Sequence, residues 1–203
     1  MSPRRAAAQK DGQSLYDLLV EAAEKLIATR GTADLTVREI ARTAGVADGV
    51  LYNHFSDKEE LVARALNRHV RTAETLLGEL PVAGEGTLAD NLHRHLEYGL
   101  GLHRMIVPVF SGLHGNPQIL QRFTDIGERP GYWRDRLLAY LREEQALGRI
   151  HPESDVDATA VLLVGYCHET VLGTIFPHAS RTNPPEPAAV IRTVLNGIAP
   201  SHP

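Results

Sequence analysis

A chain of 203 residues with 43% hydrophobic and 23% charged residues is long enough to bury a core, and this composition excludes a wholly disordered or collagen-like protein. The formal net charge of −4 excludes indiscriminate binding to polyanions, because non-specific DNA affinity comes from the neutralisation of phosphates. Any DNA binding must therefore depend on local geometry.

The N-terminal segment, residues 1–13, contains Arg4, Arg5 and Lys10 but no apolar run. It is therefore not a signal peptide and is expected to form a flexible basic arm. The single cysteine, Cys167, fits a reducing compartment. The longest apolar stretch, around residues 160–167, is shorter than the roughly 18 residues of a membrane span. These features predict a cytoplasmic protein without a membrane partner.

Apolar residues recur at helical spacing and no strand-like alternation persists, which predicts an all-α fold of about nine helices. The first helix is expected to begin after Ser14 as N-cap and to end at Gly31. The second begins at Thr36, which stands with Glu39 at capping-box spacing, and ends at Gly45.

The capping-box spacing occurs twice more along the chain. Ser56 with Glu59 predicts the start of a long helix, and Thr87 with Asp90 predicts the start of a helix that continues through Tyr98. Both positions precede runs of apolar residues at helical spacing. The sequence therefore predicts where these two helices begin.

The next stretch, residues 99–115, is expected to loosen, because its glycines and Pro108 break or kink helices. Pro117 then stands at a favourable first helical position. The helix that it opens is expected to bend near residues 127–131 and to continue to Leu147.

The last two helices, expected at residues 155–176 and 186–198, carry more apolar surface than one face of a monomer needs. They are candidates for a homodimer interface, and the alternative is that they are core helices of a monomer. The candidate interface residues are Val156, Ala160, Val164, Val171, Leu172, Ile175, Val190, Ile191, Val194 and Leu195.

Residues 36–61 read TVREIARTAGVADGVLYNHFSDKEEL, which predicts two short helices joined by a tight turn, a helix-turn-helix. Ala41 is small where the two helices cross, and Gly45 can adopt the left-handed backbone of the turn. The second helix, at about 47–53, is expected to leave its outer face free for the DNA major groove.

The A-G-V turn, the G-x-L-Y centre and the H-F-x-x-K-x-x-L exit of this run resemble the N-terminal signature of the TetR family, over about residues 14–61. The resemblance implies a helix-turn-helix head at residues 1–58 and a ligand-binding and dimerisation body at residues 59–203. It also implies a repressor that a small molecule releases from DNA. The alternatives are an activator, or a protein-contact adaptor without an effector.

The resemblance assigns DNA contacts to the second and third helices and to the start of the fourth. Asp48 either reads a cytosine amino group or stabilises a helix N-terminus. Asn53 either pairs with adenine or points to solvent. The predicted DNA-binding residues are Thr36, Arg38, Ala47, Asp48, Gly49, Tyr52, Asn53, His54 and Lys58.

Aromatic and soft side chains gather between about residues 88 and 176, where we expect a pocket for a small, largely apolar effector. The alternative is that these residues are plain core. The candidate pocket residues are Tyr98, Leu102, Met105, Val109, Phe110, Phe123, Tyr132, Trp133, Leu163, Tyr166, Cys167 and Thr170.

The ten histidines suggest a metal or haem site, with His93 and His95 the closest pair. Helical ligands that share a face stand three or four residues apart, which this pair does not. The sequence therefore predicts no metal and no cofactor. It also lacks the motifs of a nucleophile elbow, a phosphate-binding loop or a zinc protease, so no enzyme activity is expected. The predicted partners are double-stranded operator DNA, bound at a palindrome by a homodimer, and a small-molecule effector.

Overall fold

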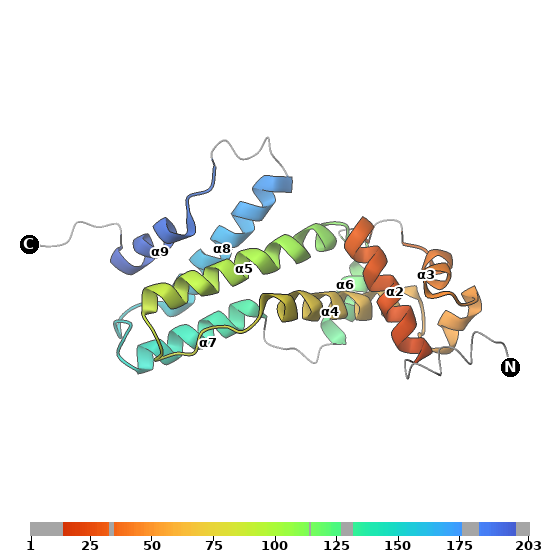
Figure 1. Cartoon of the computed structure of the whole chain (residues 1–203), viewed down its shortest axis with the longest axis horizontal. Coiled ribbons are helices and arrows are strands. Elements are labelled where there is room, and N and C mark those ends of the chain that lie inside the picture. The colour runs from red at the N-terminus through yellow and green to blue at the C-terminus, as the bar shows by residue number, and fades with distance from the viewer. Residues whose placement is uncertain (1–13, 33–34, 114, 127–131, 176–182, 198–203) are drawn as a thin grey trace, which may run out of the picture. The chain divides into compact units, whose positions relative to one another are not determined.

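The computed structural model describes residues 14–32, 35–113, 115–126, 132–175 and 183–197, and every regular element within these ranges is a helix (Figure 1). The described residues form two compact units. The first unit lies within Met1–Glu74 and Ile106–Glu128, and the second within Thr75–Met105 and Arg129–Pro203. The expected basic arm at residues 1–13 lies outside the described residues, and the expected division after residue 58 remains a prediction.

The first two helices of the first unit begin and end where local side-chain chemistry predicts. In α2 (Leu15–Arg30) the Ser14 hydroxyl accepts a hydrogen bond from a backbone N–H of the first turn. In α3 (Val37–Ala44) Thr36 and Glu39 form a complete capping box, and Gly45 ends the helix in the left-handed conformation with φ 70°. These predicted boundaries are confirmed.

The next two elements differ from the expectation in detail. The element after the turn, η1 (Asp48–Asn53), is a 3-10 helix. The capping expected for Ser56 and Glu59 is wrong by one residue, because α4 (Lys58–Leu77) is capped by Asp57, whose Oδ1 accepts from the Glu60 N–H at 2.9 Å. The Glu60 carboxylate in turn accepts from both the N–H and the hydroxyl of Ser56. The short Asp57 side chain reaches the third backbone N–H of the helix, so it takes the capping position.

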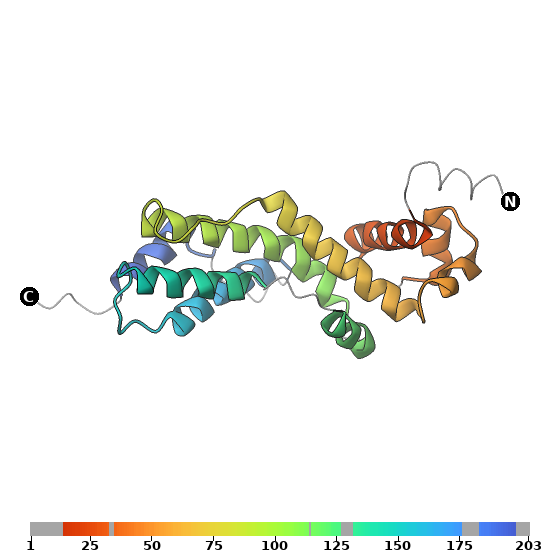
Figure 2. The same ribbon diagram turned by 90° about the horizontal axis from the view of Figure 1, so that it is seen from below.

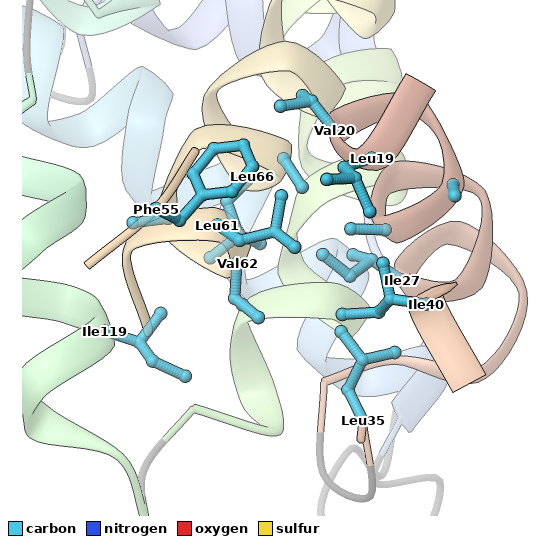
Figure 3. Close-up of a cluster of buried hydrophobic side chains, with 14 of the residues drawn as sticks. Leu19, Val20, Ile27, Leu35, Ile40, Phe55, Leu61, Val62, Leu66 and Ile119 are labelled. Atoms are coloured by element: carbon cyan, nitrogen blue, oxygen red, sulfur yellow. The ribbon is translucent and has the colours of Figure 1, made fainter. Parts of the chain in front are cut away.

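The core of the first unit is a cluster of aliphatic and aromatic side chains from α2, α3, η1 and α4 (Figure 3). The end of α5 (Leu88–Ser111), the turn that follows it and α6 (Pro117–Asp125) complete the cluster with Val109, Leu113, Ile119 and Phe123. In Figure 3, Ile27 and Leu61 point into this cluster from different helices. The three-helix motif therefore packs on one contiguous core with segments from far along the chain.

The expected loosening at residues 99–115 is wrong, because α5 is one helix that spans Leu88–Ser111. Its expected start is confirmed, since the Thr87 hydroxyl accepts from the Asp90 N–H. Gly99 leaves room for a neighbour instead of breaking the helix, because a Cβ built there would meet Trp133 at 2.2 Å. Pro108 lies near the C-terminal end of α5, where its ring interrupts one hydrogen bond of the helix.

The second unit contains most of α5 with α7 (Trp133–Ala146), α8 (Val156–Ile175) and α9 (Pro187–Asn196) (Figures 1 and 2). The bend expected at residues 127–131 lies outside the described residues. By length and composition alone α8 could cross a membrane, with a mean hydropathy of 1.3, contrary to the expectation that no apolar stretch is long enough. One such helix is weak evidence, because a core helix of a soluble protein has the same composition.

Candidate nucleic-acid interface and effector region

The helix-turn-helix places one side of its second element in the core and the other in solvent. Leu51 and Phe55 are fully or almost fully buried, and the Phe55 ring stacks on Tyr16 with ring centroids 4.9 Å apart. The Val46 N–H donates to the Ala41 carbonyl across the turn. The buried side chains therefore hold the backbone of η1 against the core, while Asp48, Tyr52 and Asn53 on its other side are exposed.

The predicted DNA contacts are at the surface of the first unit. Eight of them are exposed, and Tyr52, with 61% exposure, is a large ring held outside the core. Lys58 is partly exposed and is the first residue of α4. The exposed residues are Thr36, Arg38, Ala47, Asp48, Gly49, Tyr52, Asn53 and His54. The predicted DNA-binding residues therefore all lie on the helix-turn-helix or at the start of α4, the helix that follows it.

The start of α4 carries several carboxylates, and cations neutralise two of them. Arg122 of α6 donates to the Asp57 carboxylate and to the Ser56 hydroxyl. Arg64 pairs with Glu60 at 2.9 Å, and the hydrogen bond from the Ser56 backbone lowers the pKa of Glu60. Repulsion between these carboxylates and a DNA phosphate is therefore reduced beside Lys58.

Asp48 and Asn53 lie at opposite ends of η1, and both are exposed. Ala47, which precedes η1, offers no side-chain cap, and Asp48 is the only acidic residue of its first turn. Both roles considered for Asp48, and both for Asn53, remain predictions.

The candidate effector residues divide between the two units. Val109, Phe110 and Phe123 belong to the first unit, where they pack in or against its core, and the two phenyl rings lie 5.1 Å apart. The other candidates lie in the second unit, and Tyr132 is 47% exposed. The buried ones there are Tyr98, Leu102, Trp133, Leu163 and Cys167, and the partly buried ones are Met105, Tyr166 and Thr170. No single unit therefore brings the whole candidate set together.

A polar seam that the sequence analysis did not find runs between α5 and α7 in the second unit. Glu144 is fully buried and accepts from the Tyr140 hydroxyl at 2.6 Å, and Arg149 lies 3.2 Å from its other oxygen. Burial raises the pKa of Tyr140. His103 donates from Nδ1 to the Gly99 carbonyl at 2.7 Å, and burial lowers the pKa of His103. The sequence did contain a signal for this seam, since polar residues of α5 at a spacing of about four positions lie on the same face of the helix.

The histidines and the cysteine do not assemble a metal site in the described residues. The rings of His103 and His168 meet from different helices with centroids 4.5 Å apart, but no group of three or more metal-ligating side chains is found in those ranges. Cys167 is fully buried, and burial raises the pKa of its thiol to about 12. Such a thiol is unreactive at neutral pH.

The residues predicted for the dimer interface on α8 and α9 do not all lie at the surface. Val156, Ala160 and Val171 are buried within the chain itself, whereas Leu172 is exposed. Val164 and Ile175 are partly buried; on α9, Ile191 is buried, Val190 and Val194 are partly buried, and Leu195 is exposed. The outer face of α8 also presents Val161 and Leu162, with 55% and 65% exposure, which the sequence analysis missed. Apolar residues occur on both the buried and the exposed face of α8, so their spacing alone did not show which face is exposed.

Comparisons with known proteins agree with this architecture. Residues 19–65 match the family model described as "Bacterial regulatory proteins, tetR family". The repressor KstR2 of Mycobacterium tuberculosis H37Rv is 48% identical over 149 residues, which are 68% of this chain and 70% of that protein. The fatty acid metabolism regulator of Bacillus subtilis is 28% identical over 167 residues, 80% of this chain and 84% of that protein.

Solved structures support the fold. The Bacillus subtilis regulator FadR in complex with stearoyl-CoA superposes with a TM-score of 0.60 and 22% identity, over 91% of this chain and all of that one. The extent of the KstR2 match and the match of the helix-turn-helix region to the family model are sufficient to assign the family. The chain belongs to the TetR family of bacterial regulatory proteins and is a DNA-binding transcriptional regulator.

Proposed function

We propose that this protein is a repressor that binds a palindromic operator as a homodimer and that an acyl-CoA thioester releases it. The observation that carries the DNA-binding part is the exposed outer face of η1 next to Lys58 at the start of α4. We place the DNA-binding domain at residues 1–58, the ligand and dimer domain at residues 59–203, and the protein in the cytoplasm, with regulation and not catalysis as its activity.

Phosphate contacts would come from Lys58 and the first backbone N–H groups of α4, because a helix N-terminus favours an anion. Tyr52 and His54 would contact the groove or its edge from the exposed side of η1. The tight core contacts of Leu51 and Phe55 would hold these side chains in a fixed register. A dimer with two such heads would reach successive major grooves about 34–36 Å apart.

The homodimer is supported by the outer face of α8. Val161, Leu162 and Leu172 expose apolar side chains there, and a Cβ built at Gly165 meets nothing within 4 Å. A second copy of the same helix would cover these side chains, since an isologous interface pairs one surface with itself. Residues of α9 such as Leu195 would extend the interface.

An acyl-CoA effector is supported by the matches to Bacillus subtilis proteins. The curated relative is described as a fatty acid metabolism regulator, and the similar solved structure, of the regulator FadR, is a complex with stearoyl-CoA. The buried aromatic and aliphatic side chains of the second unit, among them Leu102, Trp133 and Leu163, suit an apolar acyl group. An effector that binds better when the two heads are splayed would weaken DNA binding, and DNA would weaken effector binding by the same factor.

The test of the DNA-binding part compares the parent with a Lys58→Ala and Tyr52→Ala double variant on DNA fragments that flank the gene. Lys25, an exposed lysine of α2, provides the control variant Lys25→Ala. We expect the double variant to lose affinity, and the Lys58→Ala single variant to reduce the slope of log affinity against log salt by about 1. A folded double variant that binds as tightly as the parent would refute the contact assignment and favour a protein-contact role.

A further inference from the structure

Two buried polar side chains of the second unit have no hydrogen-bond partner among the described residues. Both ring nitrogens of His95 are in this state although only 1% of the residue is exposed, and so is the indole Nε1 of Trp133, which is 2% exposed. Buried polar groups in folded proteins are nearly always hydrogen-bonded. The lack of partners for His95 and Trp133 in the same unit therefore requires an explanation.

The neighbours of these side chains are partnered. The Tyr140 hydroxyl donates to Glu144, the His103 Nδ1 donates to the Gly99 carbonyl, and the Cys167 thiol donates to the Leu96 carbonyl at 3.9 Å. Glu144 accepts the hydrogen bond from Tyr140 at Oε1, whereas its buried Oε2 accepts none from the described residues and lies 3.2 Å from the Arg149 guanidinium. Arg136, whose buried Nε makes no hydrogen bond, donates from another nitrogen to the Tyr98 hydroxyl at 2.8 Å. His95 and Trp133 differ from these neighbours because no polar atom of either side chain has a hydrogen-bond partner among the described residues.

Both side chains lie on the same seam. His95 and Gly99 are four residues apart on α5, which is about 6 Å along a helix and on the same face. The His95 ring lies 4.4 Å from that of Tyr140 on α7, and Trp133 of α7 lies over Gly99. Only the missing Cβ of Gly99 allows the indole ring to lie there, one helical turn along α5 from His95.

The chemistry of the two groups restricts what they can bind. An indole N–H is a donor only. Burial, together with Arg136 and Arg94, lowers the pKa of His95 to about 4, so its neutral ring offers one donor and one acceptor at pH 7. Leu96, the residue after His95, and Leu137, one helical turn after Trp133, are both fully buried. A neutral carbonyl or hydroxyl oxygen suits this apolar setting, because burial of an unpaired charge is much more costly.

We propose that His95 and Trp133 form a binding site for neutral oxygen atoms carried on the acyl group of the effector, so that hydroxy- or oxo-acyl thioesters bind more tightly than the plain acyl thioester of the same length. This inference rests on the proposed function, since it specifies the effector of the same repressor. In the free protein the two groups are held without partners, and the effector supplies the partners when Trp133 moves from Gly99.

The experiment uses the full chain and four probes, namely stearoyl-CoA and its 3-hydroxy, 3-oxo and 12-hydroxy derivatives. Affinity is measured by calorimetry, and the emission of Trp133, the only tryptophan of the sequence, reports movement of its ring. The variants are His95→Phe and Trp133→Phe. The control is His93→Phe, which changes a histidine of the same helix whose partly exposed ring lies 3.3 Å from Glu97. Urea unfolding without effector is measured for each chain.

We expect at least one oxygenated probe to bind the parent about tenfold more tightly than stearoyl-CoA, the size expected for one added hydrogen bond to a buried group. His95→Phe should abolish this preference but leave the affinity for stearoyl-CoA. It should also raise the urea midpoint of the free protein, because an unpartnered polar group is removed. His93→Phe should keep the preference.

Three outcomes overturn the inference. If stearoyl-CoA binds and releases DNA but the oxygenated probes bind no better, the proposed function stands and the oxygen site is wrong. If His95→Phe lowers the urea midpoint, the ring already has a structural partner such as a buried water, and the site is also wrong. If no probe binds or releases DNA, the acyl-CoA effector of the proposed function is itself refuted, and the inference is refuted with it.

Discussion

The contact between Gly99 and Trp133 makes a sharp prediction about the second unit. In Gly99→Ala the new methyl carbon would lie 2.2 and 2.3 Å from two ring carbons of Trp133, whereas carbon atoms in contact prefer about 3.5–4 Å. The ring must therefore move by more than 1 Å, roughly the difference between these distances. Overpacking of a dense core costs about 1–3 kcal/mol, and alanine recovers up to about 1 kcal/mol of helix propensity. We expect a net loss of about 1–2 kcal/mol.

The assay for Gly99→Ala is urea unfolding followed by circular dichroism, with Trp133 emission of the native protein as a second measurement. The matched control is Gly101→Ala in the same helix. Its new methyl would meet the far end of the flexible Leu77 side chain at 2.5 Å, which can rotate away. The control should therefore be close to neutral or stabilising. A Gly99→Ala protein as stable as the parent, with unchanged emission, would show that Trp133 does not lie over Gly99.

Three further results are expected. Thr36→Ala should cost about 1 kcal/mol in urea unfolding because the cap of α3 is lost, while Thr36→Ser should keep the parent stability; equal losses would show that the hydroxyl does not cap. The pKa of His95 is about 4 in the folded protein and 6.5 for a free side chain, so the unfolded chain binds the proton first and up to about 3 kcal/mol of stability should be lost as the pH falls from 6.5 to 4. His95→Phe should flatten this dependence in urea titrations at several pH values, and an unchanged slope would contradict the assignment. Leu162→Glu should convert a dimer to a monomer in sedimentation, with Leu147→Glu as a control of similar exposure; a persistent dimer would place the interface elsewhere.

The sequence alone was sufficient for the features that depend on neighbours within a few residues. Ser14 and Thr36 cap their helices through hydrogen bonds that span three residues, and Gly45 supplies the left-handed turn between α3 and η1. These interactions need no partner from elsewhere in the chain. The helix-turn-helix, the all-α class and the resemblance to the family could therefore be predicted, although the cap of α4 was displaced by one residue.

The tertiary structure decided the features that depend on residues far apart in the sequence. The glycines of α5 were expected to break it, but Gly99 only leaves room for Trp133, 34 positions away, and the helix continues to Ser111. Apolar residues at helical spacing do not reveal which neighbour they face, so the sequence could not assign Val109 and Phe123 to the core of the first unit. For the same reason it could not distinguish the buried face of α8 from the face that exposes Leu162. Short-range hydrogen bonds are encoded locally, whereas burial is a property of the whole packed chain.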